Sequence, residues 1–179
     1  MTAPTGFALF ETAIGTCGVA WGVNGVVGLV LPESSRDAAA DRLARMGPGL
    51  VEAALPLPAR IDRLIRDIRS LLDGARIDLG TVTIDLSRVP EFDRRVYEVA
   101  RAIPPGQTLT YGDVAERLGD GGLARAVGQA LGRNPFPIVI PCHRVVAAGG
   151  EIGGFSAAGG TGTKRRMLAI ESAQGALPW

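Results

Sequence analysis

The tetrapeptide Pro-Cys-His-Arg, residues 141–144, places a nucleophile beside a titratable base. His143 is the only histidine of the chain, and Cys142 is one of two cysteines. The thiolate is the reactive form of cysteine, and a nearby imidazole can take up the thiol proton. Adjacent side chains of an extended strand point to opposite sides, so the two groups can cooperate only across a turn or through a water. The apolar run "FPIVI" is expected to be a strand, and Pro141 at its end favours such a turn.

Two further points qualify this interpretation. A catalytic histidine usually needs an acid to orient it, and Glu171 in "KRRMLAIESA" is a candidate, although the pattern leaves other carboxylates open. The apolar run before Cys142 also fits a simpler alternative, in which the cysteine is a small buried hydrophobic residue.

Residues 1–87 are predicted to form a small unit of strands and helices. "FALFETAI", "CGVAWGV" and "VVGLVLP" are predicted strands, and Asn24-Gly25 is a strong hairpin signal between the last two. A helix is expected in "SSRDAAADRLARM", which begins with capping serines. A second is expected over 58–74, where apolar residues recur at three- and four-residue steps, and "VTIDL" (82–86) alternates like a strand. No motif in residues 1–87 indicates a catalytic site.

The second half is predicted to be mostly helical. One helix is expected in "EFDRRVYEVARAI", and two short ones, "YGDVAERLG" and "LARAVGQALGR", flank a glycine-rich turn. That arrangement is typical of a helix-turn-helix, although many helical hairpins bind nothing. The last helix contains Gly128 and Gly132, each of which costs about 1 kcal/mol relative to alanine. Either close packing or close approach to a nucleic-acid backbone would explain them, with Arg125 as the long side chain reaching past.

Composition excludes several classes of protein. With 46% apolar residues the chain can bury a core. Cys17 and Cys142 cannot form a disulfide framework and match no zinc-site spacing, so we expect a reducing compartment and no metal. No apolar run approaches the ~20 residues of a membrane span, and the first residues make a poor signal peptide. A soluble, cytoplasmic protein is expected. Residues 87–179 carry a net charge of +3 against −2 before them, which mildly favours an anionic partner.

The motifs of the second half occur together in one known family. "TYGDVAERLG", "ARAVGQALGRNP", "NPFPIVIPCHRVV" and "GGFSAAGGTGTKRRMLAIE" follow one another over residues 88–172. This half of the chain resembles the O6-alkylguanine-DNA alkyltransferases, or methylated-DNA–protein-cysteine methyltransferases. The resemblance implies an α+β fold. Residues 1–87 would be a small ribonuclease-H-like α/β supporting domain. Residues 88–179 would be a mostly helical, winged-helix-like domain with a helix-turn-helix that binds DNA and accepts the alkyl group.

The resemblance also implies a role for each matching residue of the reaction centre. Cys142 would accept the alkyl group. His143 would act as a base through a water, oriented by Glu171. Asn134 would bridge the two helices and the active-site turn. Tyr111 would crowd the phosphate beside the target nucleotide, help to hold the base, and donate a proton to the departing guanine.

Contacts to the base and to DNA are implied for a second set of residues. Arg125 would insert into the duplex where the flipped base was. The backbone of Cys142 and Val145 would read the exocyclic amine of guanine, and Ser156 would lie in the loop that meets the alkylated oxygen. The full predicted set of substrate and DNA contacts is Arg125, Ala124, Gly128, Tyr111, Val145, Ser156 and Lys164, with Lys164 lining the pocket or its rim.

The implied activity is DNA repair by direct reversal of damage. A methyl or larger alkyl group would move irreversibly from O6-alkylguanine, with O4-alkylthymine as a further candidate, to Cys142, once per molecule. The partner would be double-stranded DNA bound through its minor groove, the protein a monomer, and no cofactor or metal would be needed. Three alternatives remain: a lesion-binding relative without transfer, a cysteine hydrolase, and a structural domain with an inert cysteine.

The chain departs from the family pattern at two places. Two alanines separate Phe155-Ser156 from Gly159-Gly160, where the human-type pattern is shorter, so the pocket loop is expected to be wider or reshaped. Tyr97 stands where tryptophan is common, on a helix face that is expected to be core.

Overall fold

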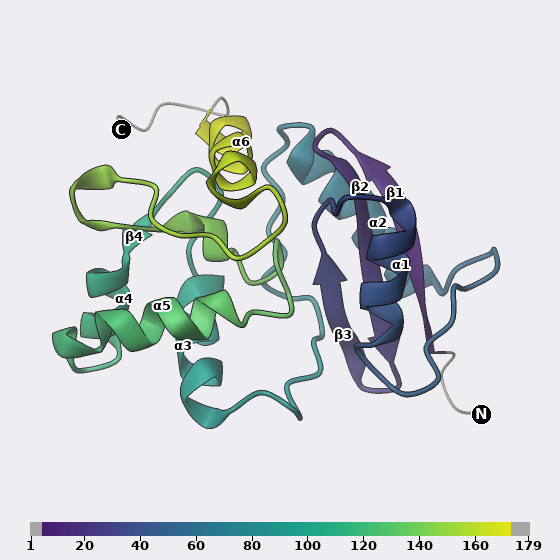
Figure 1. Cartoon of the computed structure of the whole chain (residues 1–179), viewed down its shortest axis with the longest axis horizontal. Coiled ribbons are helices and arrows are strands. Elements are labelled where there is room, and N and C mark those ends of the chain that lie inside the picture. The colour runs from purple at the N-terminus through teal and green to yellow at the C-terminus, as the bar shows by residue number, and fades with distance from the viewer. Residues whose placement is uncertain (1–4, 173–179) are drawn as a thin grey trace.

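A computed structural model of the chain describes residues 5–172 (Figure 1). Residues 1–4 and 173–179, including the end of the domain predicted over 88–179, lie outside the described residues. The first half is a three-stranded antiparallel sheet of β1 (Gly6–Thr12), β2 (Gly15–Gly22) and β3 (Gly25–Val30), in that order. The predicted Asn-Gly hairpin is present, because Gly22 pairs with Gly25 across the turn.

Two helices cover the two faces of this sheet. Helix α1 (Arg36–Ala44) begins at Ser35, whose hydroxyl accepts a hydrogen bond from the amide of Ala38, as the capping serines predicted. It packs on one face, and the amphipathic α2 (Ala59–Leu72) packs on the other. The alternation of strand residues accounts for this: Ala20 belongs to the apolar cluster of α1, and its neighbours belong to that of α2.

The strand predicted over 82–86 is wrong as an independent strand. Only Ile84 bridges to β3, with backbone hydrogen bonds from Val26 N to Thr83 O (3.0 Å) and from Asp85 N to Val26 O (2.7 Å). The carboxylate of Asp85 then accepts a hydrogen bond from the amide of Ser87 (2.9 Å). Such a side-chain turn leads the chain away from the sheet before more residues can pair.

The second half contains the remaining helices. Helix α3 (Glu91–Arg101) precedes β4 (Leu109–Thr110), α4 (Tyr111–Arg117), the short η1 (Gly121–Leu123) and α5 (Ala124–Gly132). After a long turn come η2 (Cys142–Arg144), β5 (Val145–Val146), η3 (Ala148–Gly150) and α6 (Gly160–Ser172). The predicted helices are present, and Thr110 caps α4 in a reciprocal capping box with Asp113.

One pairing of distant segments positions the site. β4 and β5 form a parallel pair in which Leu109 lies opposite Val145 and Thr110 opposite Val146. The first residue of α4, Tyr111, is thereby brought beside the segment that follows Cys142. This pairing cannot be read from either dipeptide alone.

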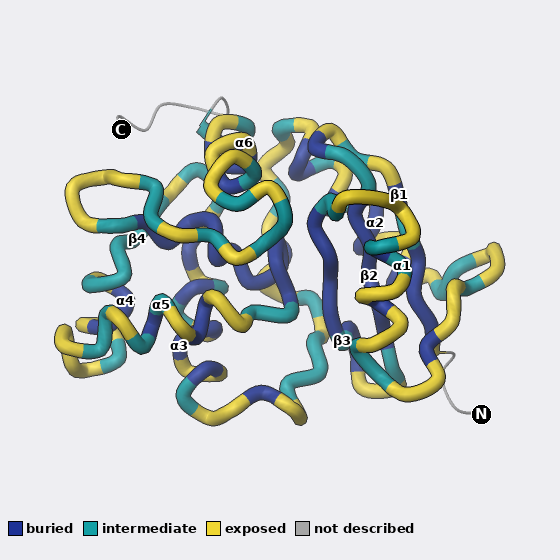
Figure 2. Tube along the Cα trace, in the orientation of Figure 1, coloured by how far each residue is buried: buried dark blue, intermediate teal, exposed yellow. Residues whose placement is uncertain are grey.

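The two halves share one apolar core. Buried residues lie in both halves of the chain (Figure 2). One cluster of buried side chains includes Phe10 in β1, Ile68 in α2, Val96 in α3 and Met167 in α6. Tyr97 is buried in it, as expected for that helix face. Within residues 5–172, no helix is long and apolar enough to cross a membrane.

Candidate active site

Asn134 shapes the turn that leads to the nucleophile. Its side-chain oxygen accepts a hydrogen bond from the amide of Phe136 (2.9 Å), and its side-chain nitrogen donates one to the carbonyl of Ile140 (2.9 Å). The run "FPIVI" is therefore a closed turn, and the extended strand expected there is wrong. Ile138 within it has φ of 75° although it is β-branched and buried, a conformation that costs on the order of 1–3 kcal/mol.

A buried charge network lies behind Cys142, at the start of η2. His143 Nε2 lies 2.8 Å from Glu171 Oε1, and the guanidinium of Arg144 donates to both oxygens of that carboxylate at 2.8–3.3 Å. Because a carboxylate only accepts hydrogen bonds, Nε2 carries the proton. Nδ1 is then an acceptor, and it has no hydrogen-bond partner among the described residues. The structure thus brings the predicted base and acid together and leaves the base one free lone pair.

Burial sets the protonation of this network. Burial alone would raise the pKa of Glu171, but its contacts with His143 and Arg144 lower it to about 2. Burial lowers the pKa of His143 in spite of Glu171, which keeps the imidazole neutral at pH 7. Burial raises the pKa of the Cys142 thiol, and contacts with Asn134 and Lys164 oppose that rise. The resting pair is therefore a thiol and a neutral imidazole that can accept its proton.

Lys164 is fully buried and joins three segments around the site. Its ammonium donates to the carbonyls of Val145 (2.6 Å) and Gly154 (3.2 Å) and to the hydroxyl of Tyr111 (3.4 Å). It also lies 5.6 Å from the centre of the Tyr111 ring and 5.9 Å from that of Phe155. Burial lowers its pKa to about 8, so it is largely charged at pH 7.

The thiol opens onto a hollow of about 690 Å³ beside α5, called the α5 hollow here. Cys142 is largely buried, with 9% of its surface exposed, and it forms part of the wall of this hollow. Six of the predicted site residues line this hollow: Tyr111, Ala124, Arg125, Gly128, Cys142 and Ser156. Val145, Lys164, Asn134, His143 and Glu171 do not line it.

The glycines of α5 are not required by packing inside the protein. A Cβ added at Gly128 would lie 3.7 Å from the Tyr111 ring, which is ordinary contact, and one at Gly132 would meet nothing within 4 Å. Both positions face the α5 hollow, and Arg125 on the same helix is exposed. Of the two explanations that the sequence left open, close approach by a partner is the one these distances favour.

Sequence reasoning did not single out Phe155 and Arg144 as site residues. Phe155 lines the α5 hollow beneath Lys164, and its only signal was its place next to Ser156 in a glycine-rich loop. Arg144 anchors Glu171 and also donates to the carbonyl of Ile103 (2.6 Å). Its position beside His143 gave no indication that both residues would bind the same carboxylate.

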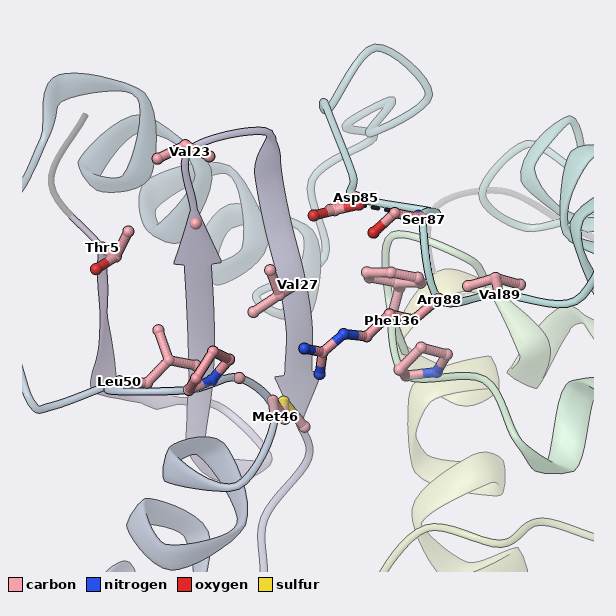
Figure 3. Close-up of a pocket in the computed structure, with 14 residues that line it drawn as sticks. Thr5, Val23, Val27, Met46, Leu50, Asp85, Ser87, Arg88, Val89 and Phe136 are labelled. Atoms are coloured by element: carbon pink, nitrogen blue, oxygen red, sulfur yellow. Dashed lines mark hydrogen bonds between the residues drawn. The ribbon is translucent and has the colours of Figure 1, made fainter. Parts of the chain in front are cut away.

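A second hollow, of about 430 Å³, is lined in part by Pro135 and Phe136, which follow Asn134 (Figure 3). Its walls are mostly apolar, with Val27, Met46 and Leu50 on one side and Phe136 on the other. Arg88 extends into it from the segment that joins the halves. Cys142 does not line this second hollow, whereas it does line the α5 hollow.

The chain is similar to known proteins over much of its length. The family model for the DNA-binding domain of 6-O-methylguanine DNA methyltransferase matches residues 91–173. The methylated-DNA–protein-cysteine methyltransferase of Methanothermobacter thermautotrophicus is 39% identical over 154 residues, which are 86% of this chain and 78% of that protein. The protein of the same name from Mycolicibacterium paratuberculosis is 48% identical over 90 residues, which are 50% of this chain and 53% of that protein.

The similarity to solved structures covers more than nine-tenths of the chain. The Mycobacterium tuberculosis OGT in complex with DNA has a TM-score of 0.74 at 29% identity, covering 94% of this chain and 93% of that one. The O6-methylguanine-DNA methyltransferase of Pyrococcus kodakaraensis has a TM-score of 0.68 at 28% identity, covering 92% and 98%. Fold and sequence together define the class as a DNA-repair methyltransferase. Within that class, this chain belongs to the methylated-DNA–protein-cysteine methyltransferase family.

Proposed function

We propose that this protein repairs DNA by transferring a methyl or larger alkyl group from O6 of guanine to Sγ of Cys142. One observation carries the proposal: the thiol opens into a hollow shared with Tyr111 and Arg125, while His143 and Glu171 lie directly behind it. A nucleophile, a neutral base and room for a planar guest therefore meet at one point.

The target base has to leave the duplex to reach the thiol. Extruding a nucleotide costs a few kcal/mol of lost stacking and pairing. In the proposal, α4 and α5 act as the helix-turn-helix, α5 enters the minor groove, and Arg125 fills the vacated stack. The small residues Ala124 and Gly128 let the DNA backbone come close. Few base-edge contacts are needed, which suits a protein that must inspect any sequence.

The transfer step conserves atoms and charge. The thiol proton passes through a water to His143 Nδ1, and Glu171 stabilises the imidazolium that results. Sγ then attacks the alkyl carbon, the S–C bond forms, and the C–O6 bond breaks with its electron pair left on guanine. Guanine takes a proton from the Tyr111 hydroxyl, whose pKa burial raises, so the phenol is protonated and available as an acid. The imidazolium then returns its proton to the Tyr111 phenolate through water, so that overall one proton moves from the Cys142 thiol to guanine.

The thioether product limits each protein molecule to one reaction. A thioether at Cys142 is not hydrolysed by any group that lines the α5 hollow, so each molecule acts once.

In the same proposal, residues 1–87 are a ribonuclease-H-like support, residues 88–179 hold the winged-helix-like DNA-binding unit, and a cytoplasmic monomer repairs duplex DNA. O4-alkylthymine is a second candidate substrate. A lesion-binding relative without transfer is the alternative, and the presence of Cys142 argues against it.

Intact-protein mass spectrometry after mixing with a duplex that contains O6-methylguanine tests the proposal. The chain should gain one methyl group, on the peptide that holds Cys142. Cys142→Ala should gain none yet still bind the duplex. Cys17→Ala is the matched control, because Cys17 is fully buried and its pKa is raised to about 11, so this variant should react like the unaltered protein. Methyl transfer to Cys142→Ala would refute the assignment.

A further inference from the structure

The outer face of α5 carries two long side chains, those of Arg125 and Gln129. Both residues are exposed, and both line the α5 hollow. They are four residues apart, so they lie on one side of the helix, separated by about 6 Å along its axis. The proposed function gives a role to Arg125 and none to Gln129.

No contact inside the protein accounts for the Gln129 side chain. Within residues 5–172, its amide group has no hydrogen-bond partner. The residues beside it on this face are small, because Gly128 precedes it and Gly132 follows about one turn later, and both glycines line the α5 hollow. The exposed amide is therefore free to meet a partner that lies against α5.

The minor groove of DNA presents a limited set of groups to such an amide. Every base pair offers acceptor atoms there, and only the 2-amino group of guanine offers a donor. A glutamine side chain has both an acceptor oxygen and a donor nitrogen. It can accept a hydrogen bond from the 2-amino group of guanine and donate one to N3 of the same base, a pair of contacts that no other base allows.

We propose that Gln129 contacts the minor-groove edge of a base pair beside the lesion and favours a guanine there. This inference rests on the proposed function and adds a preference for the sequence around the lesion. Arg125 fills the vacated stack in that function. An amide about 6 Å further along α5 then lies within about two base pairs of the lesion, because the rise of DNA is about 3.4 Å per base pair.

Gln129 is a specificity residue in this role, because it contacts neither the alkyl carbon nor Sγ of Cys142. One contact to a base edge gives a preference and not a requirement. The inference is therefore compatible with a protein that inspects any sequence.

A competition between two duplexes, with protein limiting, tests the inference. Both duplexes carry O6-methylguanine, and they differ in one nearby guanine, which is replaced in one duplex by hypoxanthine, a base that lacks the 2-amino group. The replacement is made in turn at each of the two base pairs on either side of the lesion, in either strand. At one of these positions the unaltered protein should repair the guanine duplex about fivefold faster. Because both duplexes compete for the same protein molecules, this ratio does not depend on how much of a variant is active.

Gln129→Leu should bring the ratio to about one, because leucine has a similar volume and no hydrogen-bonding group. Gln107→Leu is the matched control, since Gln107 is also exposed but lies outside α5 and does not line the α5 hollow. This control should keep the preference. A preference that survives Gln129→Leu, or no preference in the unaltered protein, would overturn the inference.

A second competition, between O6-methylguanine and O6-methylhypoxanthine as the lesions, separates a contact with the neighbouring base from one with the lesion itself. If Gln129→Leu changes the ratio for this pair and leaves that for the neighbouring guanine unchanged, Gln129 contacts the extruded base and the inference is wrong. If the unaltered protein transfers no methyl group to Cys142 from any duplex, the proposed function itself fails. Methyl transfer without a preference for the neighbouring guanine removes only the role of Gln129.

Discussion

At the scale of single residues, Cys142 and His143 are neighbours in sequence with opposite surroundings. The cysteine lines the α5 hollow, whereas the imidazole is fully buried against Glu171. The turn of η2 produces this difference within one peptide step. Burial raises the pKa of the thiol and lowers that of the imidazole, so both groups are neutral at rest. The thiol proton must therefore move to His143 before Sγ can attack.

We expect the single-turnover rate of methyl transfer to rise with pH between about pH 6 and pH 8, as more of the thiol ionises. Lys164, with a pKa of about 8, loses its charge above that pH and ceases to lower the pKa of Cys142, so the rise should flatten. Quenched single-turnover assays between about pH 6 and pH 9 measure how the rate of methyl transfer depends on pH. A rate that does not change with pH would mean that the thiolate is already formed at neutrality.

Glu171→Gln should lower the free energy of unfolding at pH 7 by about 3 kcal/mol, because Arg144 would keep a buried charge without its partner. The carboxylate has a pKa of about 2 in the fold against the ordinary 4.5. Its contribution is therefore complete above about pH 4.5 and is lost as the pH falls toward 2. Urea unfolding at several pH values measures this.

Glu116→Gln is the control for the preceding substitution, because Glu116 is exposed on α4. This change should leave stability nearly unaltered. If the two variants were equally stable, the buried network would not contribute as the distances imply.

At the scale of elements, α5 is anchored on its inner side and has an outer face of small residues. It is anchored from behind by α3, where the Tyr97 hydroxyl donates to the carbonyl of Ala130 (3.0 Å) and Asp93 binds Arg133 (2.9 Å). Its outer face carries glycines that no internal contact requires. A rigid helix with a shallow surface is suited to lie against a nucleic-acid backbone.

Gly128→Ala should raise the free energy of unfolding by up to about 1 kcal/mol, because alanine favours a helix and the new Cβ meets only ordinary contact. It should at the same time weaken binding to lesion-containing duplex, measured by fluorescence anisotropy. Gly162→Ala in α6 is the matched control, with no atom within 4 Å of its new Cβ, and should gain stability without losing affinity. Loss of affinity in both variants would remove the role proposed for this helix face.

At the scale of the whole molecule, the two halves are tied together along several segments. Leu29 N donates to the carbonyl of Pro135 (2.8 Å), which attaches β3 to the turn of the active site, and the guanidinium of Arg166 in α6 binds the carbonyl of Ala13. The shared apolar core runs between these ties. The first half thus supports the turn that carries the nucleophile.

We expect the protein to unfold in a single cooperative transition, because separating the halves would expose part of one common core. Urea transitions followed by far-ultraviolet circular dichroism and by the fluorescence of Trp21, in a Trp179→Phe background, should coincide. Two separated midpoints would show that the halves are stable independently.

Much of this architecture follows from local chemistry that is visible in the chain. The Asn24-Gly25 hairpin, the serine and threonine caps and the apolar periodicity of α2 and α3 each depend on residues within a few positions of one another. The same holds for the gathering of Cys142 and His143 in one tetrapeptide. The motifs around them were specific enough to indicate the family.

Contacts between distant segments were decided only by the tertiary structure. The run before Cys142 is apolar enough for a strand, yet the Asn134 side chain closes it into a turn. Residues 82–86 alternate like a strand, yet Asp85 turns the chain after one bridge. The α5 hollow combines Tyr111 of α4, the residues of α5, Cys142 and the loop before α6. Side-chain hydrogen bonds and packing across such separations depend on the tertiary arrangement of the whole chain, which no local pattern encodes.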